Sequence, residues 1–154
     1  MTQLTHPATV LLTGATGYIG SHTWLALHQA GLKVIGVDNF YNSSPKVLER
    51  LRSLMGVEPL FHKADVTDAA ALTAVFAQHR VDAVVHFAAY KAVGESAQKP
   101  LMYYDHNMRA LTTVAQVMAA HQCHRIVFSS SATVYGLPDA SPIREDAPWR
   151  PASP

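Results

Sequence analysis

A short glycine-rich segment constrains the fold of this chain more than any other feature. It is TGATGYIGSH, residues 13–22, with glycines at positions 14, 17 and 20. A short apolar run, residues 9–12, precedes it, and apolar residues at helical spacing follow it from Ile19 to Ala30. The order of strand, glycine turn and helix predicts the first unit of a parallel α/β sheet.

Glycine is needed at each of these three positions for a different physical reason. Gly14 can adopt a strand-end conformation that a Cβ would resist, Gly17 lets the main chain lie against a ligand, and Gly20 lets the helix approach the sheet closely. The free N–H groups and positive dipole end of the helix then favour a diphosphate. Because ligand-free turns also show this G-x-x-G-x-x-G spacing, the motif needs support from elsewhere in the chain.

An acidic residue at the end of the next predicted strand gives that support. Residues 33–38, KVIGVD, indicate a second buried strand that ends in Asp38. A carboxylate at this position accepts both ribose hydroxyls of an adenosine and repels a 2′-phosphate, which favours NAD over NADP. The alternative for Asp38 is a solvated loop acid.

Three more strands and three more helices are predicted after Asp38. Strands are expected at residues 60–65, 81–87 and 125–129, and helices at about 45–54, from 67 or 68 to 79, and 100–122. Ser44 is the expected cap of the first of these helices. Together with the first unit, the pattern predicts an α/β fold with a doubly wound parallel sheet of Rossmann type and strand order 3-2-1-4-5.

Two of these segments carry further expectations. After Asp82, the strand VDAVVHF is apolar apart from His86, as in a strand buried on both faces, and His86 is interpreted as a buried core histidine. On the last helix an apolar stripe is interpreted as core or as a subunit contact, so a homodimer is a hypothesis. The stripe consists of Leu101, Tyr104, Met108, Leu111, Ala115 and Met118.

Polar residues gather where the predicted strands end. Asp38 and Asp65 each end a strand, Lys91 follows the fourth strand, and Ser131 and Thr133 follow the fifth. Because parallel strands share one carboxyl edge, these residues should line one mouth, where such sheets bind ligands. Asp65 can accept the exocyclic amino group of an adenine or cap the next turn, and both alternatives stay open.

Net charge and cysteine content limit the partners and the cellular location that are expected. The 154 residues suit one domain, residues 1–154, and the formal net charge of +1 implies neither nucleic acid nor an anionic membrane surface as a partner. Cys123 is the only cysteine and no apolar run approaches a membrane span, so a cytoplasmic location is expected. His121 and His124 are interpreted as a solvated helix end, with no metal site expected.

Four motifs together resemble one family. They are TGATGYIGSH, DNFYNSS, HFAAYKAVGESAQKPLMYYDHN and FSSSATVYG. They are similar to the amino-terminal half of the UDP-glucose 4-epimerase family, which belongs to the extended short-chain dehydrogenases/reductases. The resemblance covers about residues 10–154. It implies a Rossmann-type domain that binds NAD, in an isomerase that interconverts UDP-glucose and UDP-galactose.

The resemblance also implies a role for each matching residue. Ser131 would bond the sugar hydroxyl that is oxidised, and Thr133 is a second hydroxyl near it. The family usually has two asparagines where this chain has His106 and Asn107, so one cofactor contact is open. The implied cofactor-binding residues are Gly14, Gly17, Tyr18, Ile19, Gly20, Asp38, Asn39, Ser43, Asp65, Val66, Phe87, Ala88, Ala89, Lys91 and Asn107.

The family's catalytic base falls outside these residues. Similar enzymes place the tyrosine of a Y-x-x-x-K helix directly after the segment that matches residues 151–154, and a UDP-sugar-binding region follows. That tyrosine, its pKa lowered by the lysine and the nicotinamide, removes the 4-hydroxyl proton while hydride passes to NAD. Tyr135 is interpreted as a packing residue and not as a replacement base. The chain is therefore expected to be a fragment truncated after the fifth strand, inactive alone, with an open, aggregation-prone edge.

Two other classes of function remain open. One is a sugar-nucleotide dehydratase of the same superfamily, although dehydratases usually carry an aspartate and a glutamate before Val-Tyr-Gly, where this chain has Ser131, Ala132 and Thr133. The other is a short NAD-binding module without catalysis.

Overall fold

The fold is built on a five-stranded parallel sheet. A computed structural model describes residues 8–137, 139 and 141–151. The strand order is β3-β2-β1-β4-β5, and all neighbouring strands pair in parallel, as the sequence predicted. The strands are β1 Thr9–Thr13, β2 Lys33–Asp38, β3 Phe61–Lys63, β4 Ala83–His86 and β5 Ile126–Phe128.

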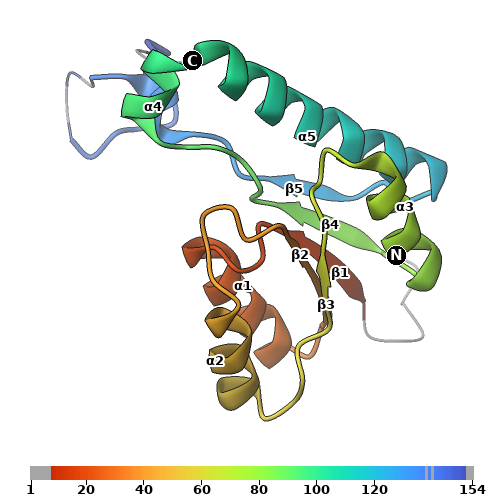
Figure 1. Cartoon of the computed structure of the whole chain (residues 1–154). Helices are drawn as coiled ribbons and strands as arrows, with labels where there is room; N and C mark the ends of the chain where they lie inside the picture. The colour runs from red at the N-terminus through yellow and green to blue at the C-terminus, as the bar shows by residue number, and fades with distance from the viewer. Residues whose placement is uncertain (1–7, 138, 140, 152–154) are drawn as a thin grey trace.

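Helices cover both faces of this sheet. Figure 1 shows α1 and α2 on one face and α3 and α5 on the other, with α4 beside the start of α5. The doubly wound arrangement is therefore confirmed. The elements are α1 Tyr18–Gln29, α2 Lys46–Met55, α3 Ala69–Gln78, α4 Val93–Gln98, α5 Pro100–Ala120 and a 3-10 helix at Ala132–Tyr135.

Each face of the sheet has its own hydrophobic core. Leu11 and Ile35 point to the side of α3 and α5, where they pack with Val114. Their neighbours along the strands, such as Leu12, point to the opposite side and pack with Trp24 of α1. Because alternate residues of a strand face opposite sides, a sheet covered twice requires the continuous apolar strands seen in the sequence.

The buried face of α1 differs from the expected one. Ile19, the first residue of the predicted periodic set, is 51% exposed, whereas Trp24 is 2% exposed. The residues of α1 that are fully buried are Gly20 and Trp24. The apolar spacing predicted the helix correctly but not the side that it buries, because Trp24 fills the space over Gly36 of β2.

The interpretation of the α5 stripe as core is wrong for most of its members. Leu101, Tyr104 and Met108 are 81%, 56% and 58% exposed. The helix instead buries residues that, apart from Met118, lie outside this stripe, and it packs against α3. The buried residues are Tyr103, Ala110, Thr113, Val114, Val117 and Met118.

The helix starts after β2 and β3 differ in their caps. At α2 the N-cap position is Pro45, one residue after the predicted Ser44, and it has no side-chain cap. The Ser44 hydroxyl still accepts a hydrogen bond from Lys46 N at 3.4 Å. At α3 the carboxylate of Asp68 accepts two backbone N–H bonds at 3.0 Å, which confirms one of the two expected starts.

The last described strand, β5, forms one edge of the sheet, as expected. Its residues Ile126, Val127 and Phe128 are 42%, 62% and 51% exposed. A strand edge with exposed β-branched and aromatic residues can pair with further chain segments. Among the described residues, no helix combines the length and the apolar character that crossing a membrane requires.

His86 is a buried core histidine, as interpreted from the sequence. The residue is 2% exposed, and its Nδ1 lies 2.8 Å from the Thr13 hydroxyl of the neighbouring strand. Burial disfavours the charged ring and lowers the pKa of His86 from 6.5 to about 4. The imidazole is therefore neutral at pH 7 and acts as a hydrogen-bonding part of the core.

Acid should destabilise the fold through His86. The stability that the neutral His86 ring contributes is complete above its unfolded-state pKa of 6.5. It is lost as the pH falls toward the folded-state pKa of about 4. We expect the free energy of unfolding to fall by about 3 kcal/mol across that range, since the unfolded chain binds the proton more tightly. Urea unfolding of a His86→Gln variant should show a flatter pH dependence, whereas His124→Gln, at an exposed histidine, should keep the full loss.

Candidate functional site

The glycine turn between β1 and α1 is closely packed against the end of β4. Gly14 has a φ of +64°, and a Cβ there would lie 2.8 Å from the backbone nitrogen of Ala88. A Cβ on Gly20 would collide with the carbonyl oxygen of Gly14. Only glycine satisfies both constraints. The turn, the start of α1 and the segment after β4 therefore pack closely together, and we call these three segments the floor of the mouth.

The amino terminus of α1 faces outward over this floor. Its N-cap residue is Gly17, no side chain caps the helix, and the first turn contains no acidic residue. The first two helical residues, Tyr18 and Ile19, are 75% and 51% exposed. Backbone N–H groups and the positive end of the helix dipole are therefore presented at the mouth, which suits a diphosphate.

Asp38, at the end of β2, is tied to the glycine turn. Its Oδ2 accepts a hydrogen bond from Thr16 N at 3.0 Å, and its Oδ1 accepts one from Phe40 N at 2.8 Å. The Ser43 hydroxyl lies 2.7 Å from that of Thr16 and 3.4 Å from Asp38 Oδ1. Thr16 is a site residue that the sequence did not reveal. Its role depends on a contact between the turn after β1 and the end of β2, which only the fold brings together.

Asp65 follows β3 by two residues and is held as a carboxylate. It accepts hydrogen bonds from Asn39 Nδ2 at 2.8 Å, Thr67 N at 2.9 Å and the Thr67 hydroxyl at 2.7 Å. Burial alone would raise its pKa, but the bonds from Thr67 and Asn39 and the charge of His106 leave the pKa below its ordinary value. Its turn-capping role is therefore confirmed, and the adenine contact stays a prediction.

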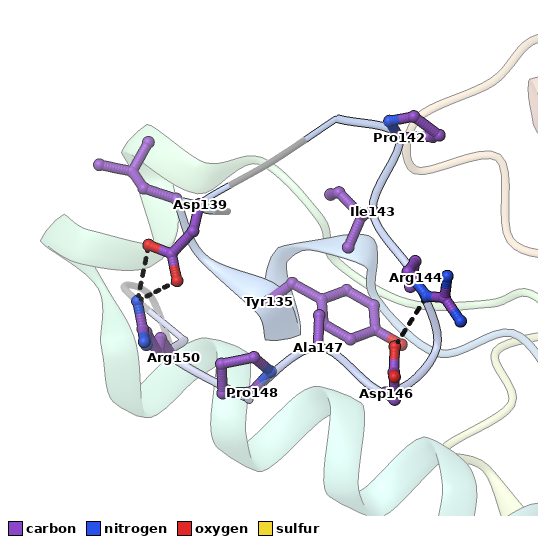
Figure 2. Close-up of a pocket in the computed structure, with 10 residues that line it drawn as sticks. Tyr135, Asp139, Pro142, Ile143, Arg144, Asp146, Ala147, Pro148 and Arg150 are labelled. Atoms are coloured by element: carbon purple, nitrogen blue, oxygen red, sulfur yellow. Dashed lines mark hydrogen bonds and ion pairs between the residues drawn. The ribbon is translucent and has the colours of Figure 1, made fainter.

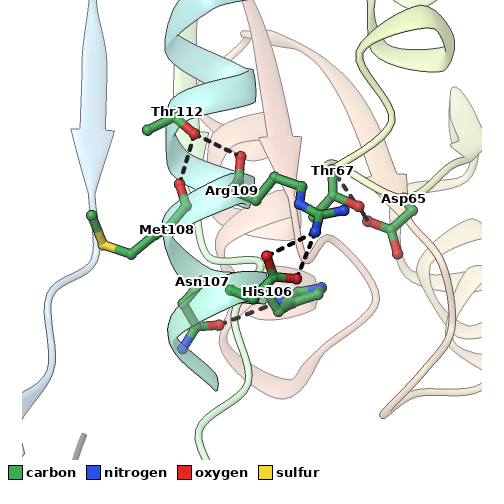
Figure 3. Close-up of polar contacts among 8 residues, drawn as sticks. Asp65, Thr67, His106, Asn107, Met108, Arg109 and Thr112 are labelled. Carbon is green, nitrogen blue, oxygen red and sulfur yellow. Dashed lines mark hydrogen bonds and ion pairs between the residues drawn. The ribbon is translucent and has the colours of Figure 1, made fainter. Parts of the chain in front are cut away.

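Helix α5 brings His106 to this side of the mouth, together with Arg109, which the sequence did not predict. In Figure 3, His106 and Arg109 of α5 point toward the region of Asp65 and Thr67. The Arg109 guanidinium binds both carboxylate oxygens of Asp105 at 2.7 Å. These residues come from a helix that follows Asp65 by some forty positions, so only the fold brings them together.

Asn107 and His106 hold the segment that follows β4. Asn107 receives a hydrogen bond from Tyr90 N at 2.8 Å and donates one to Tyr90 O at 3.0 Å. The ring of His106 stacks on that of Tyr90 with 3.8 Å between centroids, and His106 Nε2 is buried without a hydrogen-bond partner among the described residues. Asn107 therefore positions the segment through which the cofactor is expected to cross, since both ends of its amide are engaged.

The two candidate hydroxyls lie after β5 and are adjacent. Ser131 caps the 3-10 helix, its Oγ accepts a bond from Thr133 N at 3.2 Å, and the two side-chain hydroxyls hydrogen-bond each other. Both side chains are exposed at the surface. An exposed pair of hydroxyls can donate hydrogen bonds to a hydroxyl of a ligand and accept them from it.

Tyr135 lines a pocket of about 180 Å³ together with Ile143, Ala147 and Pro148. Figure 2 shows its ring beside residues 142–148 of the following segment. Arg150 closes the loop, since its N donates to Val134 O at 2.9 Å and its guanidinium lies 3.2 Å from the Asp139 carboxylate. This environment agrees with the interpretation of Tyr135 as a packing residue.

The remaining predicted contacts lie around the same edge. Val66 is 4% exposed and belongs to the core, so it can contact a ligand only through its small exposed surface. Ala88 N donates to the Thr13 hydroxyl at 3.3 Å, which fixes the start of the segment after β4. Asn39, Ser43 and Phe87 are half-buried, and Ala89 and Lys91 are exposed.

The residues present fit a dinucleotide. A Cβ would fill the space at Gly14 and Gly20, the first turn of α1 is uncapped by any side chain, and Asp38 closes the next strand. This carboxyl edge of the sheet can hold a diphosphate at the start of α1 and a ribose at Asp38.

A protein-family comparison agrees with this geometry. Residues 10–154 match the model of the NAD dependent epimerase/dehydratase family. A rice (Oryza sativa subsp. japonica) protein, UDP-glucose 4-epimerase 2, is 52% identical over 149 residues, which are 95% of this chain and 36% of the rice protein. The chain thus spans less than half the length of this relative.

Solved structures give the same result. A UDP-glucose 4-epimerase from Bifidobacterium longum, in complex with NAD⁺ and UDP, is 46% identical with a TM-score of 0.88 over 93% of this chain and 43% of that one. A UDP-glucose 4-epimerase from Stenotrophomonas maltophila, with bound NAD and formylated UDP-arabinopyranose, is 42% identical and has a TM-score of 0.90. The match covers 95% of this chain and 44% of that one.

Proposed function

Since the chain belongs to the NAD dependent epimerase/dehydratase family, we propose that it is the amino-terminal, NAD-binding part of a UDP-glucose 4-epimerase. The observation that carries this proposal is the pairing of an uncapped glycine turn with Asp38, whose carboxylate is tied to that turn through Thr16. The similarity to UDP-glucose 4-epimerases over nearly all of the chain supports the choice of reaction.

The chain's own residues would bind and orient the cofactor. The N–H groups at the start of α1 would hold the diphosphate, and Asp38 would accept the ribose hydroxyls of the adenosine. Asn107, by fixing the backbone of Tyr90, would keep the segment after β4 in place beneath the dinucleotide. When bound, NAD would supply a hydride acceptor and donor for the sugar carbon that changes configuration.

Ser131 would orient the sugar hydroxyl and share its proton with Thr133. A serine hydroxyl with no adjacent base cannot itself remove that proton at neutral pH. We propose that the base is the tyrosine of a Y-x-x-x-K sequence, which residues 1–154 do not contain. Residues 1–154 by themselves would then bind NAD without turning over a UDP-sugar, and turnover by this segment alone would contradict that assignment.

Replacing Ser131 with alanine tests the role of the hydroxyl in the whole protein. We expect kcat for interconversion of UDP-glucose and UDP-galactose to fall about tenfold, the worth of one hydrogen bond made in the transition state. The affinity for NAD should not change, because the Ser131 side chain hydrogen-bonds only Thr133 among the described residues and supports neither the glycine turn nor Asp38. A Ser130→Ala variant serves as the matched control, and an unchanged kcat in Ser131→Ala would remove Ser131 from the mechanism.

A homodimer and a cytoplasmic location complete the proposal. Leu101, Tyr104 and Met108 form an exposed apolar stripe along α5, at helical spacing, that a second copy could cover. The single buried Cys123 suits a reducing compartment. Sedimentation of the whole protein as a monomer only would contradict the dimer.

A further inference from the structure

Two tyrosines from different loops are in contact at the carboxyl edge of the sheet. Tyr41 lies in the loop after β2, three residues beyond Asp38, and Tyr90 lies in the segment after β4, four residues beyond His86. Their ring centroids are 4.7 Å apart, and the ring planes are tilted by 35°. Because β1 lies between β2 and β4 in the sheet, this contact connects the loops on the two sides of β1, from which the glycine turn starts.

The Tyr90 half of the contact is firmly held. Both its backbone N–H and its carbonyl are hydrogen-bonded to the side-chain amide of Asn107, at 2.8 and 3.0 Å. Its ring stacks on the imidazole of His106, with 3.8 Å between centroids and 12° between planes, and lies 5.6 Å from the ring of Tyr103. These three partners all belong to α5, so a packed helix fixes the position of the Tyr90 ring.

The Tyr41 half is held less firmly. Tyr41 is 56% exposed, and its backbone N–H donates to Asn39 Oδ1 within the same turn at 2.8 Å. The residue before it, Phe40, has a φ of +64°, a left-handed conformation that a residue with a Cβ disfavours. Because release of this strain offsets part of the contacts that are lost, the turn can open at a lower cost than a packed helix. Tyr41 is therefore the half that can swing away.

The contact lies beside the two acids expected to hold the adenosine half of a dinucleotide. Asp38 Oδ1 accepts a hydrogen bond from Phe40 N, in the turn that carries Tyr41. Burial, and then the nearby Tyr41 and Asp65, raise the pKa of the Tyr90 hydroxyl. An acid has this effect only at short range, because its charge disfavours a second negative charge close to it. Both rings and both acids thus share one part of the mouth.

We propose that Tyr41 and Tyr90 form an aromatic clasp that controls how fast the dinucleotide enters and leaves the mouth. The inference rests on the NAD binding proposed above. Passage of the dinucleotide between the loops after β2 and β4 requires the two rings to separate. The clasp is a contact between protein loops and not a contact with the ligand, so it raises the barrier to entry and the barrier to release alike. It therefore changes the rates and leaves the affinity nearly unchanged.

The spacing of the rings argues against direct binding of the adenine between them. A flat base inserted between two rings needs a separation of about 7 Å, which is twice a stacking distance of about 3.5 Å. The centroids of Tyr41 and Tyr90 are 4.7 Å apart, so the pair is closed to an inserted base. A clasp and a base-binding slot differ in what they predict, because loss of a slot would weaken the affinity.

Stopped-flow fluorescence with NADH as the probe tests the proposal on the whole protein, freed of bound nucleotide beforehand. Mixing with NADH gives the association rate constant, and displacement of bound NADH by excess NAD gives the dissociation rate constant. In Tyr41→Ala we expect both constants to rise about tenfold, the worth of one aromatic pair, with the dissociation constant unchanged within about twofold. Tyr41→Phe keeps the ring and should keep both rates.

A further control and the pattern of the two rates make the outcome decisive. Leu54→Ala, at an exposed apolar residue of α2, should have the rates of the natural protein. The clasp is overturned if Tyr41→Ala leaves both rates unchanged, or if it speeds release alone and weakens the affinity to match, as loss of a direct contact with the ligand would. Either result leaves the proposed NAD binding standing. Failure of the natural protein to bind NADH would overturn the proposed function together with the clasp.

Discussion

Replacing Asp38 with alanine is expected to weaken NAD binding at least about 150-fold. The carboxylate would make charge-assisted hydrogen bonds to two ribose hydroxyls, each worth about 1.5–3 kcal/mol. The same group holds Thr16 N and Phe40 N in the native chain, so the variant also loosens the floor of the mouth. Calorimetric titration of the purified variant with NAD measures the effect.

An Asp38→Asn variant separates the charge from the local structure. The asparagine oxygen can still accept the bond from Phe40 N, whereas the negative charge that repels a 2′-phosphate is lost. We expect NAD binding between that of Asp38→Ala and the natural protein, with a smaller preference for NAD over NADP. Equal NAD affinity in all three proteins would show that Asp38 does not face the ribose.

Replacing Gly14 with alanine is expected to cost at least about 4 kcal/mol of folding stability. A left-handed backbone costs a Cβ-bearing residue about 1–2 kcal/mol, and φ at Gly14 is +64°. The added Cβ would also lie 2.8 Å from Ala88 N and 2.9 Å from Phe87 C, backbone atoms that cannot swing aside. Urea unfolding measures the loss, which should also lower the melting temperature by about 10 °C.

Gly31→Ala is the matched control for this substitution. Its φ is +79°, but a Cβ there would have no atom within 4 Å. It should therefore lose only the backbone term, about 1–2 kcal/mol. The difference between the two variants isolates the close approach of the glycine turn to the end of β4. Equal losses would mean that the turn is less tightly packed than the structure indicates.

Most of the fold could be predicted from the sequence because buried parallel strands are continuous apolar runs. The five strands followed from those runs, and their order followed from the alternation of strands and helices that is typical of a doubly wound sheet. The faces of α1 and α5 could not be predicted in the same way. Both helices carry apolar residues on more than one side, and only packing decided that Trp24 and Val114 are buried while Ile19 and Met108 are exposed.

The candidate site was predictable where one segment carries the chemistry. The glycine turn and Asp38 are recognisable because their spacing follows a strand-turn-helix-strand unit. Thr16, Tyr90 and Arg109 were missed, because their roles arise from contacts between distant elements. His106 had a sequence signal, its departure from the family's asparagine, but its stacking on Tyr90 required the structure.

The most direct test of the account is the product that the whole protein forms from UDP-galactose with bound NAD, identified by nuclear magnetic resonance and mass. The account predicts UDP-glucose, an isomer of unchanged mass, approached from either sugar to the same equilibrium. A product lighter by one water would instead identify a dehydratase, and NAD binding without any product would identify a binding module. Either of these results would contradict the proposed function.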